Sequence, residues 1–458
     1  MLKFYNSLSN KIENFQSINS SEVKLYTCGP TVYDKAHIGN FRTFLFEDLL
    51  KRTLVAFGYK VIHIMNITDV DDKTIIKAKN SGKSLSEITQ YYTKLFHNDS
   101  LSLNILPADH YPAATKHISG MIEMIEALIK KEHAYITKEG SVFFKISSFA
   151  DYGALSNLKM NKMKHSDRVL SDEYNLDSPQ DFALWKTYKT EDSGVSWDSP
   201  WGKGRPGWHL ECSSMSMEYL GDHFDIHCGG IDNKFPHHEN EIAQSKCAFG
   251  VKFVNFWLHS EFLLVDGGKM SKSLGNVYTI PELFKNGFSA EEIRYVILSV
   301  HYRTKLNFTL KKQHEARMAI KRIQSIKLRF KSLAKLKEDS FPNVKINFDK
   351  VLSNDLDTPN AIALFFEWIR KSNIDLDAGK LNDKAAAQAL NFINYFNSIF
   401  KILSDDHDIP EKILNLVELR KEARSKNDWK RADELRSLIE DKGWLVKDTP
   451  DGQKVLHK

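Results

Sequence analysis

Residues 28–40 read Cys-Gly-Pro-Thr-Val-Tyr-Asp-Lys-Ala-His-Ile-Gly-Asn and join a predicted strand to a predicted helix. Residues 23–27 alternate as a strand does, and the apolar residues of 41–50 recur at helical spacing. A second β-like run follows at 61–65, which completes a βαβ unit. Because the N-terminus of a helix offers unpaired N–H groups and a partial positive charge, it suits phosphate. The stretch therefore predicts a nucleotide site, with Cys28 at its other end as a metal ligand.

Length and composition indicate a globular protein of several domains. The 458 residues are 42% hydrophobic and 27% charged, which is ordinary for a globular chain. No apolar run reaches the roughly 20 residues that a membrane span needs, and the first residues do not resemble a signal peptide. We therefore expect a cytoplasmic monomer with no membrane partner. The net charge of +5 permits a polyanionic partner without requiring one.

The order of the predicted elements indicates an α/β fold of several parts. Sheet-like segments stop near residue 110 and resume near residue 200, and the turn-rich chain between them includes a probable strand at 141–146. After about residue 290 the pattern becomes helical. We expect a Rossmann-type parallel-sheet domain in two halves (1–110 and 200–290), an insertion (111–199), a helical region (291–409) and a small C-terminal unit (410–458) that begins at Pro410.

Four side chains are candidate metal ligands. His237 and Glu241 stand four residues apart at a predicted helix start, so they share one face of that helix. Cys28 and Cys212 are each expected at the edge of a sheet element, near a turn. Two thiolates, one imidazole and one carboxylate are a donor set that suits Zn²⁺.

Other interpretations of the same residues stay open. The cysteines can be buried core thiols, as we expect for Cys228 and Cys247, because four scattered cysteines are too few for a disulfide scaffold. His238 and Glu239 compete as ligands. The same helix can also carry a metallohydrolase motif, with Glu239 as its general base.

A polar segment follows the second strand. Ligands of parallel sheets bind outside the C-terminal strand ends, so Thr68 and Asp69 can reach a ligand there. The alternative is that these residues form a helix cap and an acidic first turn. For Thr68 this alternative is as well supported as a ligand contact, and for Asp71 and Asp72 it is better supported.

Residues 269–276 read Lys-Met-Ser-Lys-Ser-Leu-Gly-Asn and follow a Gly-Gly turn. The side chains of Lys269 and Lys272 can stay in contact with phosphate groups while the negative charge on those groups shifts during a reaction. Taken with His-Ile-Gly-Asn at 37–40, this stretch resembles the second signature motif of the class I aminoacyl-tRNA synthetases. Asn40 replaces the final His of the family's first motif.

The resemblance narrows to the cysteinyl-tRNA synthetases, in which Asn40 is usual. It covers the whole chain and rests on residues 28–34, 204–209, 235–241 and 269–276. It implies that the insertion is a connective peptide, that 291–409 forms a stem-contact and helical-bundle domain, and that 410–458 binds the anticodon.

The resemblance also implies roles for particular residues. Zinc is expected on Cys28, Cys212, His237 and Glu241, where it binds the substrate thiolate and gives specificity over serine. The expected catalytic residues are His37, Asn40, Lys269 and Lys272. The expected ATP-binding residues are His37, Gly39, Asn40, Asp232 and Lys272, although Asp232 can also be a simple turn residue. The expected cysteine-binding residues are Gly29, Thr68 and Trp208.

The implied reaction joins L-cysteine to the 3′-terminal adenosine of tRNA(Cys) through a cysteinyl-adenylate formed from Mg²⁺-bound ATP. The alternatives are a cysteine ligase acting on an amino-sugar acceptor, a non-catalytic RNA-binding paralogue and a zinc hydrolase. The basic C-terminal unit around Trp429 favours tRNA, although it can equally be a solvated helix pair.

Overall fold

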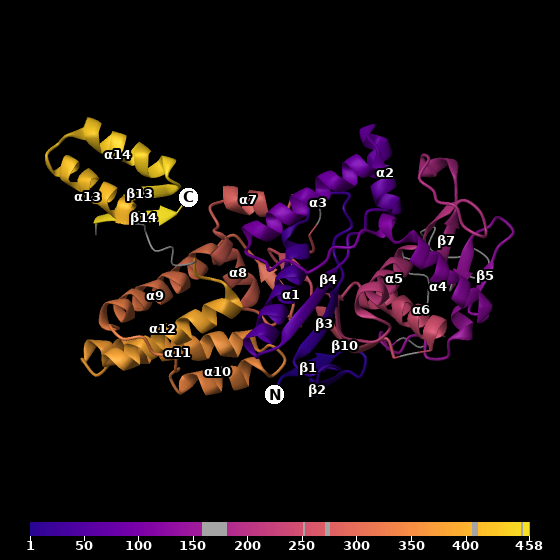
Figure 1. Ribbon diagram of the computed structural model, residues 1–458, viewed down its shortest axis with the longest axis horizontal. Coiled ribbons are helices and arrows are strands. Elements are labelled where there is room, and N and C mark those ends of the chain that lie inside the picture. Colours follow the sequence, from indigo (N-terminus) through magenta and orange to yellow (C-terminus); the bar gives the residue numbers. More distant parts are fainter. Residues whose placement is uncertain (158–180, 251, 271–274, 405–410, 450–451, 458) are drawn as a thin grey trace. The chain divides into compact units, whose positions relative to one another are not determined.

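The computed structural model describes residues 1–157, 181–250, 252–270, 275–404, 411–449 and 452–457. The chain divides into two compact units, Met1–Ile402 and Leu403–Lys458 (Figure 1). Lys272 and Pro410 lie outside the described residues. Among the described helices, none is long and apolar enough to cross a membrane.

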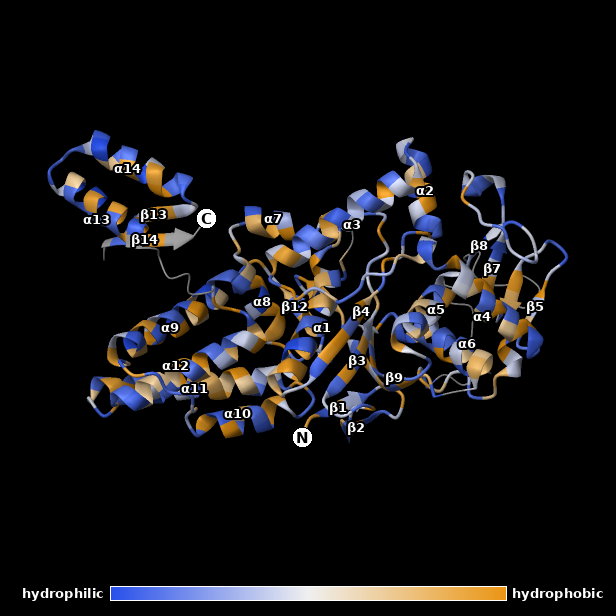
Figure 2. Cartoon of the chain, in the orientation of Figure 1, coloured by the Kyte–Doolittle hydropathy of each residue, from blue (hydrophilic) through white to orange (hydrophobic). Residues whose placement is uncertain are grey.

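A four-stranded parallel sheet lies at the centre of the first unit. It contains β3 (Glu22–Thr27), β4 (Lys60–Met65), β9 (Phe224–Gly230) and β10 (Val254–Ser260), in the order β10-β9-β3-β4. Helix α1 (Ile38–Ala56) connects β3 to β4, which confirms the predicted βαβ unit. Hydrophobic residues (orange in Figure 2) occur along both β3 and β4, and the last three residues of each strand are buried, as expected where parallel strands are covered on both faces.

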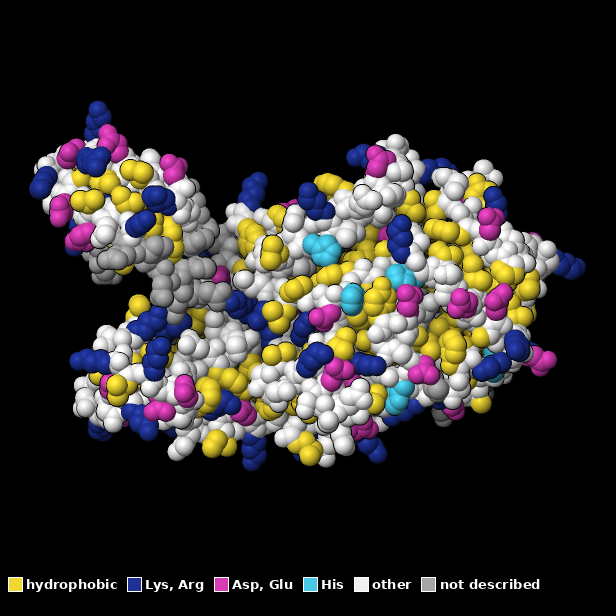
Figure 3. Space-filling view, in the orientation of Figure 1, with side chains coloured by type: hydrophobic (Ala, Val, Ile, Leu, Met, Phe, Trp, Pro, Cys, Tyr) yellow, Lys and Arg dark blue, Asp and Glu magenta, His cyan; other side chains and the backbone are white. Residues whose placement is uncertain are grey.

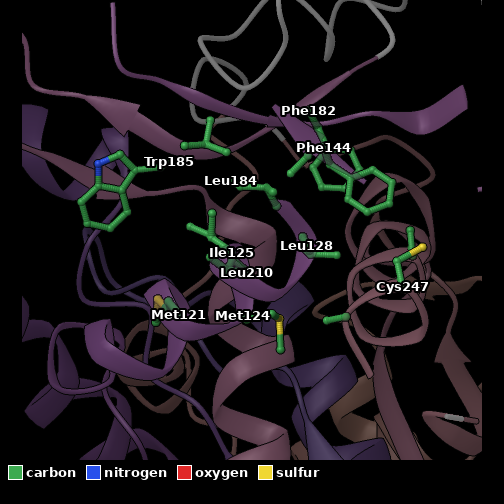
Figure 4. Packing of buried hydrophobic residues seen from close by; sticks show 14 of the residues in the cluster. Met121, Met124, Ile125, Leu128, Phe144, Phe182, Leu184, Trp185, Leu210 and Cys247 are labelled. Carbon is green, nitrogen blue, oxygen red and sulfur yellow. The ribbon is translucent and has the colours of Figure 1, made fainter. Parts of the chain in front are cut away.

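A second sheet of four antiparallel strands is inserted between the two halves of the parallel sheet. Its strands are β5 (Ala134–Ile136), β6 (Val142–Phe144), β7 (Phe182–Thr187) and β8 (Gly204–Pro206). Strand β6 confirms the strand predicted at 141–146. The sheet packs on helices α4 (Ile118–Lys130), α5 (Trp208–Leu220) and α6 (Glu239–Phe249), and Figure 4 shows side chains of this shared core.

Helices surround these sheets in the rest of the first unit. The N-terminal hairpin is formed by β1 (Lys3–Asn6) and β2 (Lys11–Asn14), and α2 (Asp72–Ser81) and α3 (Leu85–Ser102) follow β4. The later elements are β11 (Leu263–Val265), α7 (Ile280–Lys285), α8 (Ala290–Leu298), β12 (Leu306–Phe308), α9 (Lys312–Leu333), α10 (Val344–Leu352), α11 (Thr358–Asp377) and α12 (Asp383–Phe400). This succession confirms the helical pattern predicted after residue 290.

Helix α1 is joined to the helical region by buried ion pairs. Asp48 accepts hydrogen bonds from Arg294 Nη2 of α8 at 2.6 Å and from Arg52 Nε at 2.8 Å. Arg294 also donates to the carbonyl of Phe400 at the end of α12. Helix α1, which begins at the first signature motif, is therefore anchored to α8 and α12 by charged side chains that are shielded from water.

The second unit is a helical hairpin followed by a β-hairpin. It contains α13 (Glu411–Ser425), α14 (Trp429–Asp441), β13 (Trp444–Thr449) and β14 (Gly452–His457). Its own small core includes Ile413, Ile439 and Trp444. The Arg424 guanidinium lies 5.3 Å from the ring centroid of Trp429, whose side chain is 55% exposed.

Candidate metal centre and nucleotide site

The four predicted metal ligands come together from three parts of the chain. Cys28 follows β3, Cys212 lies in α5, His237 lies in a π-helical turn (Lys234–His238), and Glu241 lies in the first turn of α6. One ligand atom from each lies within 4.8 Å of all the others. His237 Nε2 is 3.4 Å from Cys212 Sγ and 3.2 Å from Glu241 Oε1. All four side chains are buried.

The prediction for Cys212 was wrong in one respect. We expected this residue at the edge of a sheet element, but it lies inside α5. Only residues 204–206 before it form a strand, and that strand belongs to the inserted antiparallel sheet. Cys212 nevertheless reaches the ligand group because α5 and α6 pack against each other.

A second group of potential ligands shares two members with the first. It consists of Cys28, His227, His238 and Glu241, again with ligand atoms within 4.8 Å of one another. Cys28 Sγ lies 3.2 Å from His238 Nε2, so His238 competes for this thiol as the sequence suggested. Because both groups need Cys28 and Glu241, a single metal ion can use only one of them.

Neighbouring side chains orient the ligands of the first group. His209 Nδ1 lies 2.9 Å from His237 Nδ1, which leaves Nε2 of His237 facing Cys212 and Glu241. Trp208 stacks on the His237 ring with centroids 4.2 Å apart. His227 Nε2 lies 2.9 Å from Glu241 Oε2 and so fixes that carboxylate.

Burial sets the protonation of this centre in the absence of metal. It raises the pKa of the Cys28 thiol well above its ordinary value, and the adjacent Cys212 thiol raises it further. Burial also raises the pKa of Cys212. Burial lowers the pKa of His237 to about 3. At neutral pH the group therefore holds two thiols and a neutral imidazole.

The residues fit a zinc ion. Glu241 Oε1 is fully buried and has no hydrogen-bond partner among the described residues; His237 Nε2, itself a predicted ligand, lies 3.2 Å from it, and His227 holds the other carboxylate oxygen. A buried oxygen with an unused lone pair is unfavourable unless a cation or donor meets it. Two sulfurs, one nitrogen and one oxygen around such a point match the donors that Zn²⁺ prefers.

The predicted cysteine-binding residues lie beside this group. Asn66 links two of them, because Gly29 N donates to Asn66 Oδ1 at 2.9 Å and Asn66 Nδ2 donates to Thr68 Oγ1 at 3.1 Å. A Cβ atom at Gly29 would stand 1.7 Å from the Asn66 carbonyl oxygen, so only glycine fits. Thr68 is not a helix cap; Asp71 caps α2, as predicted. Trp208 covers His237.

The first signature motif forms the start of α1. His37 is the N-cap residue, with Asn40 N donating to His37 Nδ1 at 3.3 Å and His37 N donating to Asn40 Oδ1 at 3.0 Å. Both side chains remain accessible enough to meet a ligand, since Asn40 is exposed and His37 is half-buried.

The two signature motifs lie side by side, although they are far apart in the sequence. Ile38 N donates to Tyr278 O at 2.8 Å, just after the second motif. The Met270 methyl group covers Gly39, where a Cβ atom would approach it to 2.1 Å. Lys269 is exposed at the start of the second motif. The structure thus brings Lys269 and the His37–Asn40 turn to one region.

Asp232 follows the end of β9. Its side chain is exposed, and Oδ1 lies 2.5 Å from the position of a Cβ atom on Gly230. This carboxylate therefore folds back over the last residue of the strand, at the end of the sheet where ligands bind. Its role as an ATP contact stays a prediction.

Two features of the site were not predicted from the sequence. Asp72 at the start of α2 pairs with Lys186 of β7 and with Arg205 of β8, and so connects the chain after Thr68 to the chain before Trp208. His227 of β9 and His259 of β10, whose Nε2 lies 2.8 Å from His238 Nδ1, were also not singled out. A histidine that follows an apolar residue within a strand was the signal that could have indicated them.

Three family matches account for most of the chain. Residues 14–318 match the class I tRNA synthetase (C) catalytic domain, 347–404 the DALR domain, and 406–455 the cysteinyl-tRNA ligase anticodon-binding domain. The parallel sheet, its inserted sheet, its helical region and its C-terminal unit are those of a class I aminoacyl-tRNA synthetase. The chain belongs to the cysteine–tRNA ligase family.

Curated relatives match over the whole length. The cysteine–tRNA ligase of Chlamydia caviae is 48% identical over 464 residues, covering 99% of this chain and 97% of that protein. That of Brachyspira hyodysenteriae is 46% identical and covers 99% of both. Among solved structures, Mycobacterium tuberculosis methionyl-tRNA synthetase with methionyl-adenylate shares the fold, with a TM-score of 0.60, 13% identity, and coverage of 83% of this chain and 90% of that one.

Proposed function

We propose that this enzyme activates L-cysteine with Mg²⁺-bound ATP and transfers it to the 3′-terminal adenosine of tRNA(Cys). In the first step a carboxylate oxygen of cysteine attacks the α-phosphorus, the bond to the β-phosphate breaks, and pyrophosphate leaves. In the second step a terminal ribose hydroxyl attacks the acyl carbon, and AMP leaves. The meeting of Cys28, Cys212, His237 and Glu241, with Cys28 on the stretch that leads into the first signature motif, is the observation that carries this proposal.

The side chains around the start of α1 act on the phosphates. His37 and Asn40 donate to phosphate oxygens where the unpaired N–H groups of the helix already favour negative charge. Gly39 lets the nucleotide approach the backbone, and Asp232 contacts the ribose side. Lys269 and Lys272 neutralise the departing pyrophosphate. Such a site works by positioning and charge stabilisation, with no covalent enzyme intermediate.

Amino-acid choice takes place at the other end of the 28–40 stretch. Cys28, Cys212, His237 and Glu241 would hold zinc, which supplies a soft centre that binds the substrate thiolate and discriminates against the hydroxyl of serine. Trp208 closes one side of the pocket, and Gly29 and Thr68 line another. An apolar pocket alone rejects close analogues only about 10–200-fold, so a direct thiolate contact adds specificity that shape cannot.

The geometry counts against the zinc-hydrolase alternative. Glu239, its candidate general base, accepts hydrogen bonds from Ser156 N at 2.8 Å and from Ser156 Oγ at 2.7 Å. Its other oxygen faces Leu155 N at 3.4 Å. Because both oxygens of Glu239 accept hydrogen bonds from residues 155 and 156, this carboxylate is not available to activate water at the ligand group.

Two observations support tRNA as the acceptor. Residues 406–455 match an anticodon-binding domain, which a ligase for a small amino-sugar acceptor has no need of. The second unit also presents an exposed aromatic ring beside a guanidinium, at Trp429 and Arg424, and such a pair suits stacking on a base.

The proposal is tested by two assays on the full chain. Each labelled amino acid is offered in turn, first for ATP–pyrophosphate exchange without tRNA and then for attachment to unfractionated tRNA. We expect cysteine alone to support both reactions. Exchange without attachment to tRNA would point to the amino-sugar acceptor, and no exchange with any amino acid would favour the RNA-binding paralogue.

A further inference from the structure

Tyr26 packs against the predicted metal centre without being one of its ligands. It belongs to β3, two residues before Cys28, and alternate residues of a strand face the same side. The strand direction continues through Cys28, whose N–H donates to Cys228 O at 3.1 Å. The Tyr26 side chain is 0% exposed, and its hydroxyl has no hydrogen-bond partner among the described residues.

Two of the four predicted ligands pack with Tyr26, and a third is connected to it through His227. The Tyr26 side chain packs in one buried cluster with Cys28 and Cys212. Burial raises the pKa of the Tyr26 hydroxyl well above its ordinary value, and among the neighbouring groups the Cys212 thiol raises that pKa most. The ring meets the edge of His227 with centroids 5.0 Å apart, and His227 in turn fixes the Glu241 carboxylate.

A buried hydroxyl without a partner is unfavourable in the metal-free protein. A thiol is a poor acceptor, whereas a thiolate accepts a charge-assisted hydrogen bond, so metal binding to Cys212 would create the missing partner. We infer that Tyr26 is a positioning residue whose hydroxyl donates to the Cys212 thiolate and so favours the metal-loaded form. This inference rests on the ligand set of the proposed function.

The test compares zinc affinity in full-length variants by competition with a chelator. We expect Tyr26→Phe to weaken zinc binding about 10–100-fold, the range seen when partners of metal ligands are lost. The metal-free Tyr26→Phe protein should unfold at the same urea concentration as the parent or at a higher one, because an unpaired hydroxyl has been removed. A cobalt-loaded sample should also show a shift of its sulfur-to-metal absorption band.

Tyr302→Phe is the matched control, because it also removes one buried hydroxyl, which donates to Asp355 Oδ1 at 2.6 Å away from the metal centre. It should lower stability and leave zinc affinity unchanged. Unchanged zinc affinity in Tyr26→Phe, or a metal-free variant as destabilised as Tyr302→Phe, would overturn the inference. Cys212→Ser separates the two claims: if it retains zinc, the ligand set itself fails, whatever Tyr26 does.

Discussion

Protonation governs what single residues of the metal centre can do. Burial keeps the Cys28 and Cys212 thiols protonated and the His237 imidazole neutral when no metal is bound. The imidazole is ready to coordinate, whereas each thiol must first lose a proton. Metal loading of this centre is therefore coupled to proton release.

Zinc affinity should fall as the pH falls. Since the pKa values of Cys28 and Cys212 lie above their ordinary value, both protons are present throughout the neutral range, and metal binding displaces both. Each displaced proton changes the apparent affinity about tenfold per pH unit, so we expect about a hundredfold loss from pH 8 to pH 7. Chelator competition at several pH values, corrected for the chelator's own protonation, measures the slope; a flat profile would contradict two thiolate ligands.

Replacing one ligand distinguishes the two overlapping groups. Cys212→Ser should abolish stoichiometric zinc, measured by elemental analysis, because it removes one of the two sulfur donors. Cys247→Ala is the control, since Cys247 is a buried thiol in the core of the inserted sheet, and it should retain zinc. His238→Asn should retain zinc as well. Loss of zinc in His238→Asn together with retention in Cys212→Ser would assign the metal to the second group.

The sequence offers the four ligands as candidates, but only the resemblance to a family selects them over the alternatives. The His237–Glu241 pair follows from helical spacing, but nothing in the spacing of Cys28 and Cys212 shows that they meet. Their contact depends on how α5 packs against α6. His227 holds the Glu241 carboxylate through a contact that only the fold creates, and its place inside an apolar strand was the one local hint of that role.

At the scale of elements, an ion-pair network joins α2 to the inserted sheet. Asp72 accepts from Lys186 Nζ at 2.8 Å and is also paired with Arg205. Arg205 Nε donates to Asp192 at 3.0 Å. Lys186, Arg205 and Asp192 are buried, so the network fixes the segments that carry Thr68 and Trp208.

Asp72→Asn should destabilise the protein and loosen the pocket. It leaves two buried cations with one carboxylate fewer, and because Asp72 is one-third exposed we expect a loss of about 2 kcal/mol in the free energy of unfolding. The KM for cysteine should rise more than that for ATP. Urea unfolding and exchange kinetics measure the two effects.

The control for this network is an exposed ion pair. Asp151→Asn breaks the contact with Lys246 Nζ at 3.2 Å, where both side chains are well exposed, and should change stability by less than about 0.5 kcal/mol. Equal effects in the two variants would show that the network does not hold the pocket.

The sequence predicted elements where the periodicity was strong. The βαβ unit, β6 and the helices after residue 290 are confirmed. Helix α5 was missed because polar and apolar residues alternate around it without a stripe: His209, Glu211 and Ser213 are as buried as Leu210. Strand β7 was missed because its turn-rich flanks indicated irregular chain.

At the scale of the whole molecule, the chain consists of units with separate cores. Residues 403–458 build their own small core, and the face shown in Figure 3 intersperses Lys and Arg with Asp and Glu, consistent with a modest net charge. Amino-acid activation and tRNA reading are therefore expected to be separable.

A chain ending at Ile402 should keep cysteine-dependent ATP–pyrophosphate exchange within about threefold of the full chain, because every described predicted site residue lies before that point. Attachment to tRNA should fall by about 10²-fold or more, since each lost base contact is worth about 1–3 kcal/mol. Parallel exchange and charging assays measure both. Undiminished charging by the shortened chain would contradict an anticodon-binding role for residues 403–458.

The most direct test of substrate recognition at the metal centre uses cobalt in place of zinc. The sulfur-to-cobalt absorption of the full-length protein is recorded as cysteine is added, with serine at the same concentration as the comparison. Direct thiolate binding predicts a stronger band with cysteine, corresponding to one additional sulfur donor, and no change with serine. An absorption that stays constant with cysteine, while exchange activity continues, would contradict it.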